Sequence, residues 1–252
     1  MNIPRKLIAL LLCTLTLLPA RAFPVSGVPE YHTAEENLPT LSLDIATSAG
    51  SAVLLDASGS CIRTLWEQNA DKRRGPASTT KVMTALVAAE KMPLSTKITV
   101  PKEAVGIEGS SVYLTEGEVF TLEELLCCTL LESANDAATA VAIAVGGSIE
   151  GFAALMNDKC AELGLVDTHF TNPHGLDHEE HYTTARELGI IAAAALESEA
   201  LRKIFSTYKM TVAAPEGGVR LLINHNRLLK SIEGCIGVKT GYTKSNGRGL
   251  VS

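Results

Sequence analysis

Apolar positions recur at the spacing of one helical face after residue 76. A Gly-Pro pair at 75–76 ends whatever precedes it, and Pro93 stops the pattern. Ser78 stands where a helix over this stretch should begin. The apolar positions of this face are Val82, Met83, Leu86 and Val87.

The same kind of pattern divides the rest of the chain into strands, helices and again strands. Segments 51–57 and 61–67 flank a turn at Ser58-Gly59 and predict a hairpin, whose first strand we expect to be buried on both faces. Further strands are predicted at 98–100, 111–115, 118–120, 209–212, 218–223, 235–243 and 248–252. Helices are predicted at 121–131, 137–145 and 149–163, with one or two more within 184–205. This order predicts an α/β (α+β) fold, with an antiparallel sheet built from N- and C-terminal strands and an inserted helical block.

Residues 1–22 have the features of a secretory signal peptide. Two basic residues precede an apolar run over 7–20, and Ala20-Arg21-Ala22 has the small-x-small pattern of a cleavage site. The run is shorter than the roughly 20 residues that cross a bilayer, so a retained anchor is the less favoured alternative. Residues 23–48 are polar and contain three prolines, which is typical of a linker. We therefore expect an exported protein with one folded domain at 49–252.

Charge and cysteine content exclude several classes of function. The chain has 22 Lys and Arg against 28 Asp and Glu, a net charge of −6, which disfavours nucleic acid as a partner. No Cys-x-x-Cys pair is present, so a zinc site of that type is not expected. Five cysteines follow the leader, an odd number, so at least one stays free or pairs outside the chain. Cys127 and Cys128 lie in an apolar helical run and are predicted to be small buried side chains.

Ser78 and Lys81 are the first candidate catalytic pair. Three residues apart on a helix, they share a face, with Cβ atoms roughly 5–6 Å apart. A serine hydroxyl needs a base to take its proton, and a neighbouring amine can be that base. Ser-x-x-Lys by itself is weak evidence, because the chain contains a second copy at Ser206 and Lys209, away from a helix start. The alternative is that Ser78 only caps the helix.

Two later motifs favour a catalytic role for Ser78 and Lys81 over a helix cap. Ser133-Ala134-Asn135 lies in a short link between two predicted helices, and if the link is extended the Ser133 and Asn135 side chains point the same way. Lys239-Thr240-Gly241 lies where a strand runs into a turn. The ordered set S-x-x-K, S-x-N and K-T-G is the signature of penicillin-binding proteins and class A β-lactamases. The alternatives without a catalytic role are a solvated Lys81, a helix cap at 133–135 and an ordinary strand end at 239–241.

With these motifs in order, the sequence strongly resembles the serine D-alanyl-D-alanine carboxypeptidases, which are low-molecular-mass penicillin-binding proteins with a β-lactamase-like transpeptidase fold. The resemblance covers about residues 49–252. Besides the three motifs it includes 76–86, 130–138, 156–157, 170–176 and 237–243.

The resemblance implies roles for single residues. Ser78 would attack a carbonyl and form an acyl-enzyme, with a neutral Lys81 as base and Ser133 as proton relay. Burial and the like charge of Lys239 would lower the pKa of Lys81. Asn135 would hold the substrate amide. The terminal carboxylate would be held by Lys239 and Thr240, Gly241 would allow close approach of the strand, and the N–H groups of Ser78 and Tyr242 would form the oxyanion hole.

The implied reaction removes the last D-alanine from peptidoglycan stem peptides, without metal or other cofactor, and β-lactam antibiotics would trap Ser78 as a slow ester. A β-lactamase is less favoured, because the nearest match to its Glu-x-x-Leu-Asn motif has Ala153 at the glutamate position. A metal site on the 174–181 loop is also disfavoured, because Pro173-His174-Gly175 indicates a turn. Its candidate ligands are His169, His174, Asp177, His178 and His181.

The end of the chain departs from the family pattern. Family members continue beyond Lys-Thr-Gly with two more strands, a helix and often a membrane anchor, whereas here only 248–252 follows. We expect the first strand and the 248–252 strand to be left unpaired at facing edges. The alternatives are a partial copy of a longer enzyme, an inactive truncated product, or a remnant that binds peptidoglycan or penicillin without turnover. Membrane association would require an anchor beyond residue 252.

Overall fold

The computed structural model describes residues 15–16, 42, 45–55 and 61–252. Most of the predicted leader 1–22 and linker 23–48 therefore lies outside the described residues. Among the described residues, no single helix is long and apolar enough to cross a membrane. Two consecutive helices over 135–162 reach the required length only as a pair bent by 80°.

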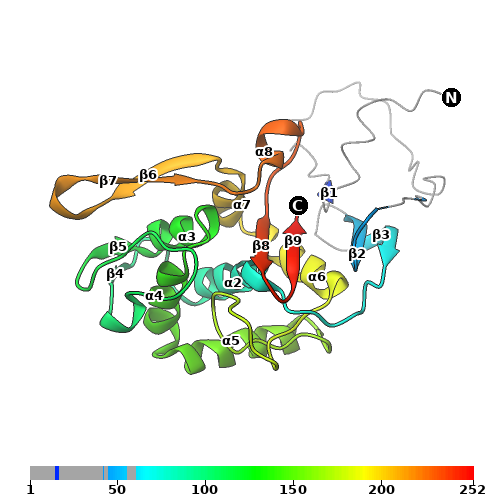
Figure 1. Cartoon of the computed structure of the whole chain (residues 1–252), viewed down its shortest axis with the longest axis horizontal. Helices are drawn as coiled ribbons and strands as arrows, with labels where there is room; N and C mark the ends of the chain where they lie inside the picture. The colour runs from blue at the N-terminus through cyan, green and yellow to red at the C-terminus, as the bar shows by residue number, and fades with distance from the viewer. Residues whose placement is uncertain (1–14, 17–41, 43–44, 56–60) are drawn as a thin grey trace, which may run out of the picture.

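A helical block forms the body of the described chain (Figure 1). Three short 3-10 turns accompany it: η3 (Ala77–Thr80), η4 (Lys102–Ala104) and η5 (Pro215–Gly217). The α-helices are α2 (Lys81–Lys91), α3 (Leu122–Leu131), α4 (Asn135–Gly146), α5 (Ile149–Glu162), α6 (Ala185–Glu197), α7 (Glu199–Ser206) and α8 (Leu228–Ser231).

Local signals in the sequence set several helix ends. Helix α3 begins with the predicted capping box, in which Thr121 and Glu124 bond each other's backbone N–H groups. Ser148 and Thr184 cap α5 and α6 through their hydroxyls. Helix α4 ends at Gly147, whose φ of +76° suits a residue without a Cβ. These helices were predicted correctly because their start and stop signals are local.

The core of the block is built from the buried faces of α2, α3, α4, α5 and α6. Met83 and Phe152 are completely buried, as are Cys128 and several alanines of α4. Burying side chains of the size of Met or Phe contributes about 1.5–3 kcal/mol each. The predicted burial of Cys127 and Cys128 is confirmed, and burial raises the pKa of the Cys127 thiol to about 12. The free cysteines of the described chain are Cys127, Cys128, Cys160 and Cys235.

Within the described residues, the strands form four small sheets. β2 (Gly50–Leu55) and β3 (Cys61–Gln68) make the predicted hairpin, and β1 (Leu15–Thr16) pairs with β2 in parallel. The antiparallel pairs β4 (Lys97–Thr99) with β5 (Val119–Thr121), and β6 (Lys209–Ala213) with β7 (Val219–Ile223), confirm further predictions. The last pair is β8 (Lys239–Thr243) with β9 (Gly247–Val251).

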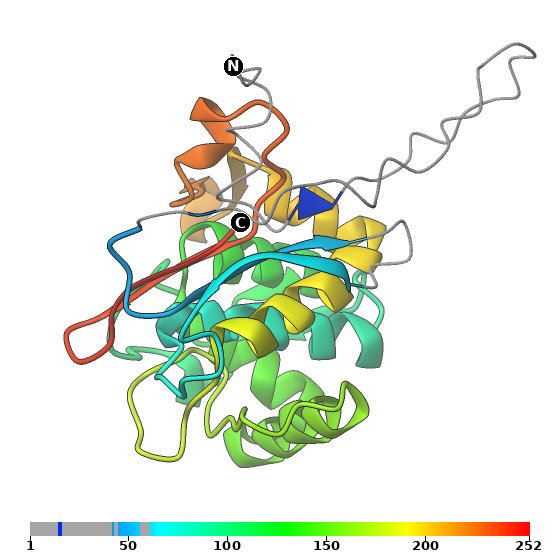
Figure 2. The ribbon, with the colours of Figure 1, turned by 90° about the vertical axis from the view of Figure 1, so that its right-hand side faces the viewer.

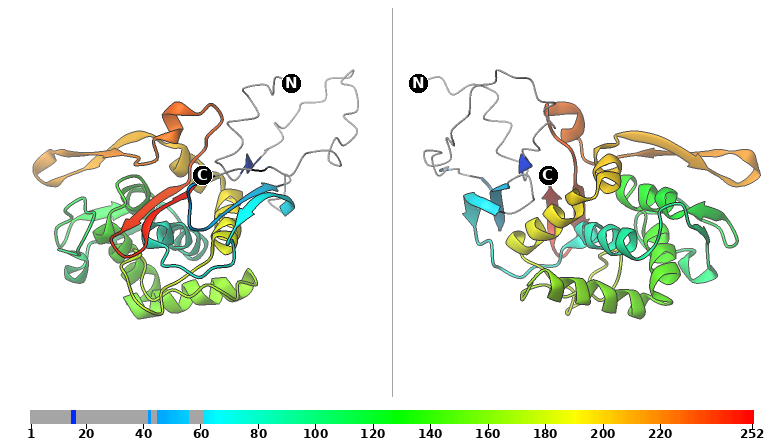
Figure 3. Two further views of the ribbon diagram at one scale, coloured as in Figure 1. Left: turned by 45° about the vertical axis from the view of Figure 1, so that its right-hand side comes forward. Right: turned by 180° about the vertical axis from the view of Figure 1, so that it is seen from behind.

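Helix α6 lies against strands from both the N-terminal and the C-terminal part of the described chain. Helix α6 contacts β2 and β9, and the β2–β3 hairpin crosses over it in Figure 2. In both views of Figure 3 the β6–β7 hairpin projects from the body as an arm. The described hydrogen bonds place β2 and β9 in separate sheets, so the two strands do not pair with each other, as expected. The expectation of an unpaired edge does not hold for all of β2, because β1 pairs with it at Leu54 and Leu55. Val53 of β2 is only half-buried, so this strand is not buried on both faces as predicted.

The predicted strand at 111–115 is wrong. Val112 and Leu114 are buried and Tyr113 is 83% exposed, which is the alternation of a strand. The backbone there bonds side chains instead of a neighbouring strand: the N–H groups of Val112 and Leu114 donate to Asp136. A periodic pattern cannot distinguish these two ways of satisfying the backbone.

Candidate active site

Ser78 lies in the turn η3, directly before α2. Thr79 holds this turn, because its N–H and its hydroxyl both donate to the Pro76 carbonyl, at 3.2 and 2.6 Å. Ala77 has a φ of +50°, which residues with a Cβ rarely adopt. Ser78 forms no cap hydrogen bond to α2, whose N-cap residue is Thr80. The helix-cap alternative for Ser78 is therefore not supported.

Lys81 is completely buried and has three polar partners. Its Nζ atom lies 2.9 Å from Ser78 Oγ, 2.7 Å from Asn135 Oδ1 and 2.7 Å from the His174 carbonyl oxygen. The contact with Ser78 was expected from the Ser-x-x-Lys motif, whereas Asn135 was expected to hold the substrate amide and not to accept from Lys81. The contact with His174 was not expected, since a main-chain carbonyl has no signature in a sequence.

The electrostatic surroundings of Lys81 favour its neutral form. Burial is the largest cause and the positive charge of Lys239 the next, and together they hold the pKa of Lys81 well below its usual value. Asp136 acts in the opposite direction but is outweighed. Burial and Lys239 are the two causes that the sequence suggested.

Asn135 is the first residue of α4, and the segment 108–110 fixes its orientation. Its backbone N–H donates to the Ser110 carbonyl at 2.7 Å, and its side-chain Nδ2 donates to the Glu108 carbonyl at 2.5 Å. With Nδ2 engaged in this way, Oδ1 is the atom turned toward Lys81.

Ser133 is buried and lines the same cavity as Ser78. Its φ of +61° shows that the link before α4 is not extended, so the predicted reason for Ser133 and Asn135 sharing a direction is wrong. The N-cap position of α4 is held by Ala134 without a side-chain hydrogen bond, so residues 133–135 do not act as a helix cap. Both side chains nevertheless reach the site.

Lys239 and Gly241 face inward from β8 toward η3. Lys239 is 1% exposed, donates to the Thr240 carbonyl at 3.0 Å, and has its pKa lowered to about 7 by burial, with Glu132 acting in the opposite direction. A Cβ on Gly241 would lie 3.2 Å from the Ser78 nitrogen. Gly241 was predicted to let the strand approach the substrate closely, and what the structure shows is a close approach of β8 to the turn that carries Ser78.

A cavity of about 1380 Å³ runs along these residues and on between β2 and β9. Its lining contains five of the predicted site residues, namely Ser78, Ser133, Thr240, Gly241 and Tyr242. His225 also lines it, and its Nε2 lies 3.4 Å from a carboxylate oxygen of Glu132. His225 belongs to no sequence motif, so its place in the site could not be predicted from the sequence.

The 171–181 loop proves to be a wall of the site. Thr84 of α2 donates from its hydroxyl to the Pro173 carbonyl at 2.6 Å, and Asn172 Oδ1 accepts from the N–H groups of His174 and Gly175. These bonds hold the His174 carbonyl over Lys81.

The histidines of this loop have protein partners. The His181 ring lies 2.8 Å from the Thr80 hydroxyl and accepts from the Thr171 N–H at 3.0 Å, so its two nitrogens are both engaged. Within the described residues, no group of three or more His, Cys, Asp or Glu side chains is placed to hold a metal ion.

Comparison with known proteins relates the chain to D-alanyl-D-alanine carboxypeptidases. A family model described as D-alanyl-D-alanine carboxypeptidase matches residues 35–252. The D-alanyl-D-alanine carboxypeptidase DacF of Bacillus subtilis is 38% identical over 205 residues, which are 79% of this chain and 52% of that protein. The carboxypeptidase DacC of Escherichia coli is 34% identical over 248 residues, 92% of this chain and 58% of that protein. The chain thus spans less than two thirds of the length of these relatives.

Solved structures agree with this relationship. A Streptomyces K15 DD-transpeptidase variant superimposes with a TM-score of 0.75 at 32% identity, covering 82% of this chain and 85% of that chain. A penicillin-binding protein homologue from Mycobacterium tuberculosis gives a TM-score of 0.75 at 30% identity, with coverages of 85% and 79%. The fold class predicted from the sequence is confirmed.

Proposed function

This chain belongs to the D-alanyl-D-alanine carboxypeptidase family, and on that basis we propose that it is a serine-type D,D-carboxypeptidase acting through an acyl-enzyme on Ser78. The reaction we propose is removal of the terminal D-alanine from a peptidoglycan stem peptide. β-Lactam antibiotics are proposed to acylate the same serine. We further propose that the protein acts outside the cytoplasm, as its substrate and the predicted leader at 1–22 require.

The hydrogen bonds of Lys81 carry this proposal. A neutral amine has two N–H donors and one lone pair, whereas an ammonium has three donors and none. The His174 carbonyl and Asn135 Oδ1 can only accept, so they take both N–H groups of a neutral Lys81. The lone pair is then left for the third partner, the Ser78 hydroxyl, at 2.9 Å. This is the arrangement that a general base for a serine nucleophile needs.

The remaining motif residues have compatible positions. Ser133 lines the same cavity as Ser78 and is proposed to pass the proton on to the leaving amine. Lys239 and Thr240 are proposed to hold the terminal carboxylate, since a charged amine and a hydroxyl suit that group. Gly241 lets β8 approach η3, and the backbone N–H groups of Ser78 and Tyr242 are proposed to stabilise the oxyanion, an interaction typically worth about 2.7–4 kcal/mol.

Rapid hydrolysis of penicillin is not expected. The position that corresponds to the deacylating glutamate of β-lactamases is occupied by Ala153, which is buried in α5 and cannot activate a water molecule. We therefore propose a long-lived penicilloyl adduct rather than turnover. Neither the family match nor the relatives favour a protein that binds without reacting.

The first experiment is labelling of the purified chain with a fluorescent penicillin, followed by assay of D-alanine release from a D-Ala-D-Ala peptide. We expect a stable adduct that is absent in Ser78→Ala and after heat denaturation. The matched control is Ser206→Ala, which removes the serine of the second Ser-x-x-Lys sequence and should label normally. Labelling that survives Ser78→Ala in folded protein would refute the assignment of the nucleophile.

A further inference from the structure

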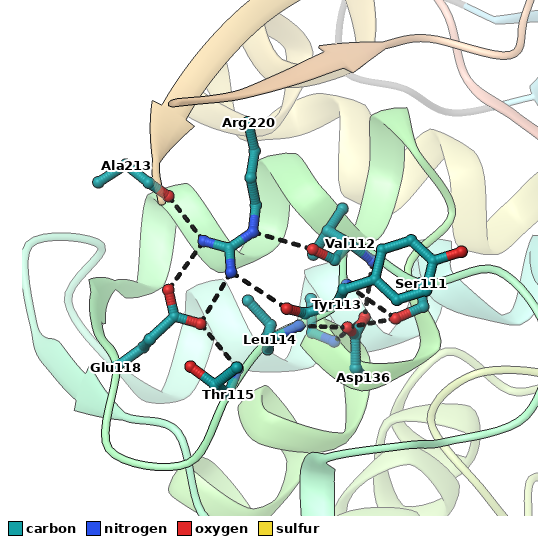
Figure 4. Close-up of polar contacts among 10 residues, drawn as sticks. Ser111, Val112, Tyr113, Leu114, Thr115, Glu118, Asp136, Ala213 and Arg220 are labelled. Carbon is teal, nitrogen blue, oxygen red and sulfur yellow. Dashed lines mark hydrogen bonds and ion pairs between the residues drawn. The ribbon is translucent and has the colours of Figure 1, made fainter. Parts of the chain in front are cut away.

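Arg220 of β7 uses every N–H group that its side chain has (Figure 4). Nε donates to the Val112 carbonyl at 2.9 Å, and one terminal nitrogen donates to the Ala213 carbonyl and to Glu118, both at 2.8 Å. The other terminal nitrogen donates to the Tyr113 carbonyl at 3.1 Å and to Glu118 at 2.8 Å. Five donors thus meet five acceptor sites, and the Arg220 and Glu118 side chains are only 12% and 14% exposed.

Asp136 holds the same segment from the other side. Its carboxylate accepts from the N–H groups of Val112 and Leu114, at 3.3 and 3.0 Å, and from the Ser111 hydroxyl at 2.6 Å. Val112 is therefore fixed at its N–H by Asp136 and at its carbonyl by Arg220. We call segment 111–114 the clamped segment, because two charged side chains replace the neighbouring strand that its pattern would predict (Figure 4).

The clamped segment continues directly from the residues that orient Asn135. Ser110 precedes it and accepts from the Asn135 N–H, and the Glu108 carbonyl accepts from the Asn135 amide. With its Nδ2 bound in this way, Asn135 turns Oδ1 toward Lys81 and accepts a hydrogen bond from the lysine amine. A continuous set of contacts therefore leads from the β6–β7 arm, through the clamped segment and Asn135, to Lys81.

We propose that Arg220 is a positioning residue for this site, which acts through segment 108–114 to hold Asn135 against Lys81. The proposal rests on the function proposed above for Ser78 and Lys81. Arg220 positions Asn135 mainly through its hydrogen bonds to three main-chain carbonyls, and less through its ion pair with Glu118. Only a planar guanidinium can donate at once to the carbonyls of Val112, Tyr113 and Ala213 and to the Glu118 carboxylate. A lysine therefore cannot replace Arg220.

Loosening of this segment would change the surroundings of Lys81. The charged or titratable groups around Lys81 are Lys239 from β8, Asp136 from α4, His174 from the 171–181 loop and His225, which lies before α8. None of these is altered in an Arg220→Lys variant. If the Asn135 amide lost its fixed orientation, water could reach Lys81. The hydrated Lys81 would have a higher pKa, so less of it would be present as the neutral base at a given pH.

The test compares Arg220→Lys with Glu118→Gln in the full chain. We expect Arg220→Lys to slow acylation by fluorescent penicillin about 10-fold at pH 7 and to move the acidic limb of the pH–rate profile upward by about half a unit or more. Glu118→Gln retains an acceptor and leaves the three carbonyl contacts of Arg220 in place, so it should lower thermal stability with little change in the profile. The matched control is Arg73→Lys, which alters an exposed arginine bound to Asp167. This variant should change neither the acylation rate nor the pH–rate profile.

Two further measurements keep the outcomes distinct. The titration of Lys81 can be followed by NMR of 13C-labelled lysine, which needs no activity. If Arg220→Lys does not fold, Ser111→Ala is used instead, because it removes two bonds of the clamped segment, one to Asp136 and one from the Tyr113 N–H. An unchanged Lys81 titration and pH profile in folded Arg220→Lys would overturn the positioning role. A wild-type chain that never labels, but whose Lys81 titration moves upward in Arg220→Lys, would overturn the proposed function and support the positioning role. Equal profile shifts in Arg220→Lys and Glu118→Gln would assign the effect to the ion pair and overturn the role of the carbonyl contacts.

Discussion

Gly175 lies against the carbonyl of Ala77, the residue before the candidate nucleophile. A Cβ on Gly175 would be less than 2 Å from that oxygen, and the φ of Gly175 is +87°. The 171–181 loop and the turn η3 are therefore in direct backbone contact. This contact places the His174 carbonyl, next to Gly175 in the chain, above Lys81.

Gly175→Ala is predicted to damage both stability and acylation. The left-handed conformation costs roughly 1–2 kcal/mol for a residue with a Cβ, and the clash with backbone should add about 1–3 kcal/mol. Urea unfolding and penicillin labelling measure the two effects. Gly147→Ala is the matched control, because its φ is +76° and nothing lies within 4 Å of a Cβ there. Equal losses in the two variants would contradict the contact described above.

Thr84→Val is predicted to slow acylation without altering the shape of the core. The substitution keeps the volume but leaves the Pro173 carbonyl without its partner, which typically costs about 1–3 kcal/mol, and frees the neighbouring His174 carbonyl to move. We expect acylation to fall about 10-fold. Thr84→Ser should restore the rate, since it keeps the hydroxyl.

The control for Thr84 is Thr129→Val. Thr129 is also fully buried, and its hydroxyl donates at 2.7 Å to Leu125 within α3, away from the site. Normal acylation is expected there. A rate in Thr84→Val that matches the Thr129→Val control would show that the Pro173 contact is only structural.

Deprotonation of Lys239 should make the rate fall on the alkaline side, or alkaline limb, of the pH–rate profile. Its pKa is lowered to about 7, so the free protein loses this positive charge, and with it carboxylate binding, as the pH rises through that value. We expect kcat/KM on a D-Ala-D-Ala peptide to fall above about pH 7. Lys239→Arg keeps its charge and should lack this limb, whereas Lys244→Arg, on the exposed β8–β9 turn, should retain it. A limb that persists in Lys239→Arg would assign it to another group.

Stability is predicted to fall between pH 6.5 and pH 5. Burial lowers the pKa of His174 to about 3 and that of His181 to about 4, against about 6.5 in the unfolded chain. Above pH 6.5 both states are neutral and the free energy of unfolding is unaffected. Below it only the unfolded state takes up protons, so each histidine destabilises the fold by about 2 kcal/mol at pH 5.

Denaturant unfolding at pH 7.5 and pH 5 measures this loss. His181→Gln should show a smaller difference between the two pH values, because one of the two protons is no longer taken up. The exposed His178→Gln variant serves as control and should behave like wild type. An unfolding free energy that does not change from pH 7.5 to pH 5 would mean that these histidines are hydrated in the folded state.

The residues that carry the chemistry, and most of the helices and strands that present them, could be predicted from local patterns in the chain. Ser78, Lys81 and Asn135 were recognisable because the motif spacings are local, and their neighbours 121–131 and 149–163 form helices because caps and glycine stops act within one turn. The causes that lower the pKa of Lys81 could also be anticipated, since a second lysine in the same site implies a like charge.

The tertiary structure alone decided which groups complete the site. The His174 carbonyl is a main-chain atom and is invisible in a pattern of side chains, and its place depends on Thr84 and Gly175, about 90 residues apart in the chain. Segment 111–115 was predicted as a strand because alternation records burial and not hydrogen-bond partners. Arg220 and Asp136 supply those partners from β7 and α4. Such long-range pairings bring together groups whose separation in sequence carries no period, so only the folded chain shows them.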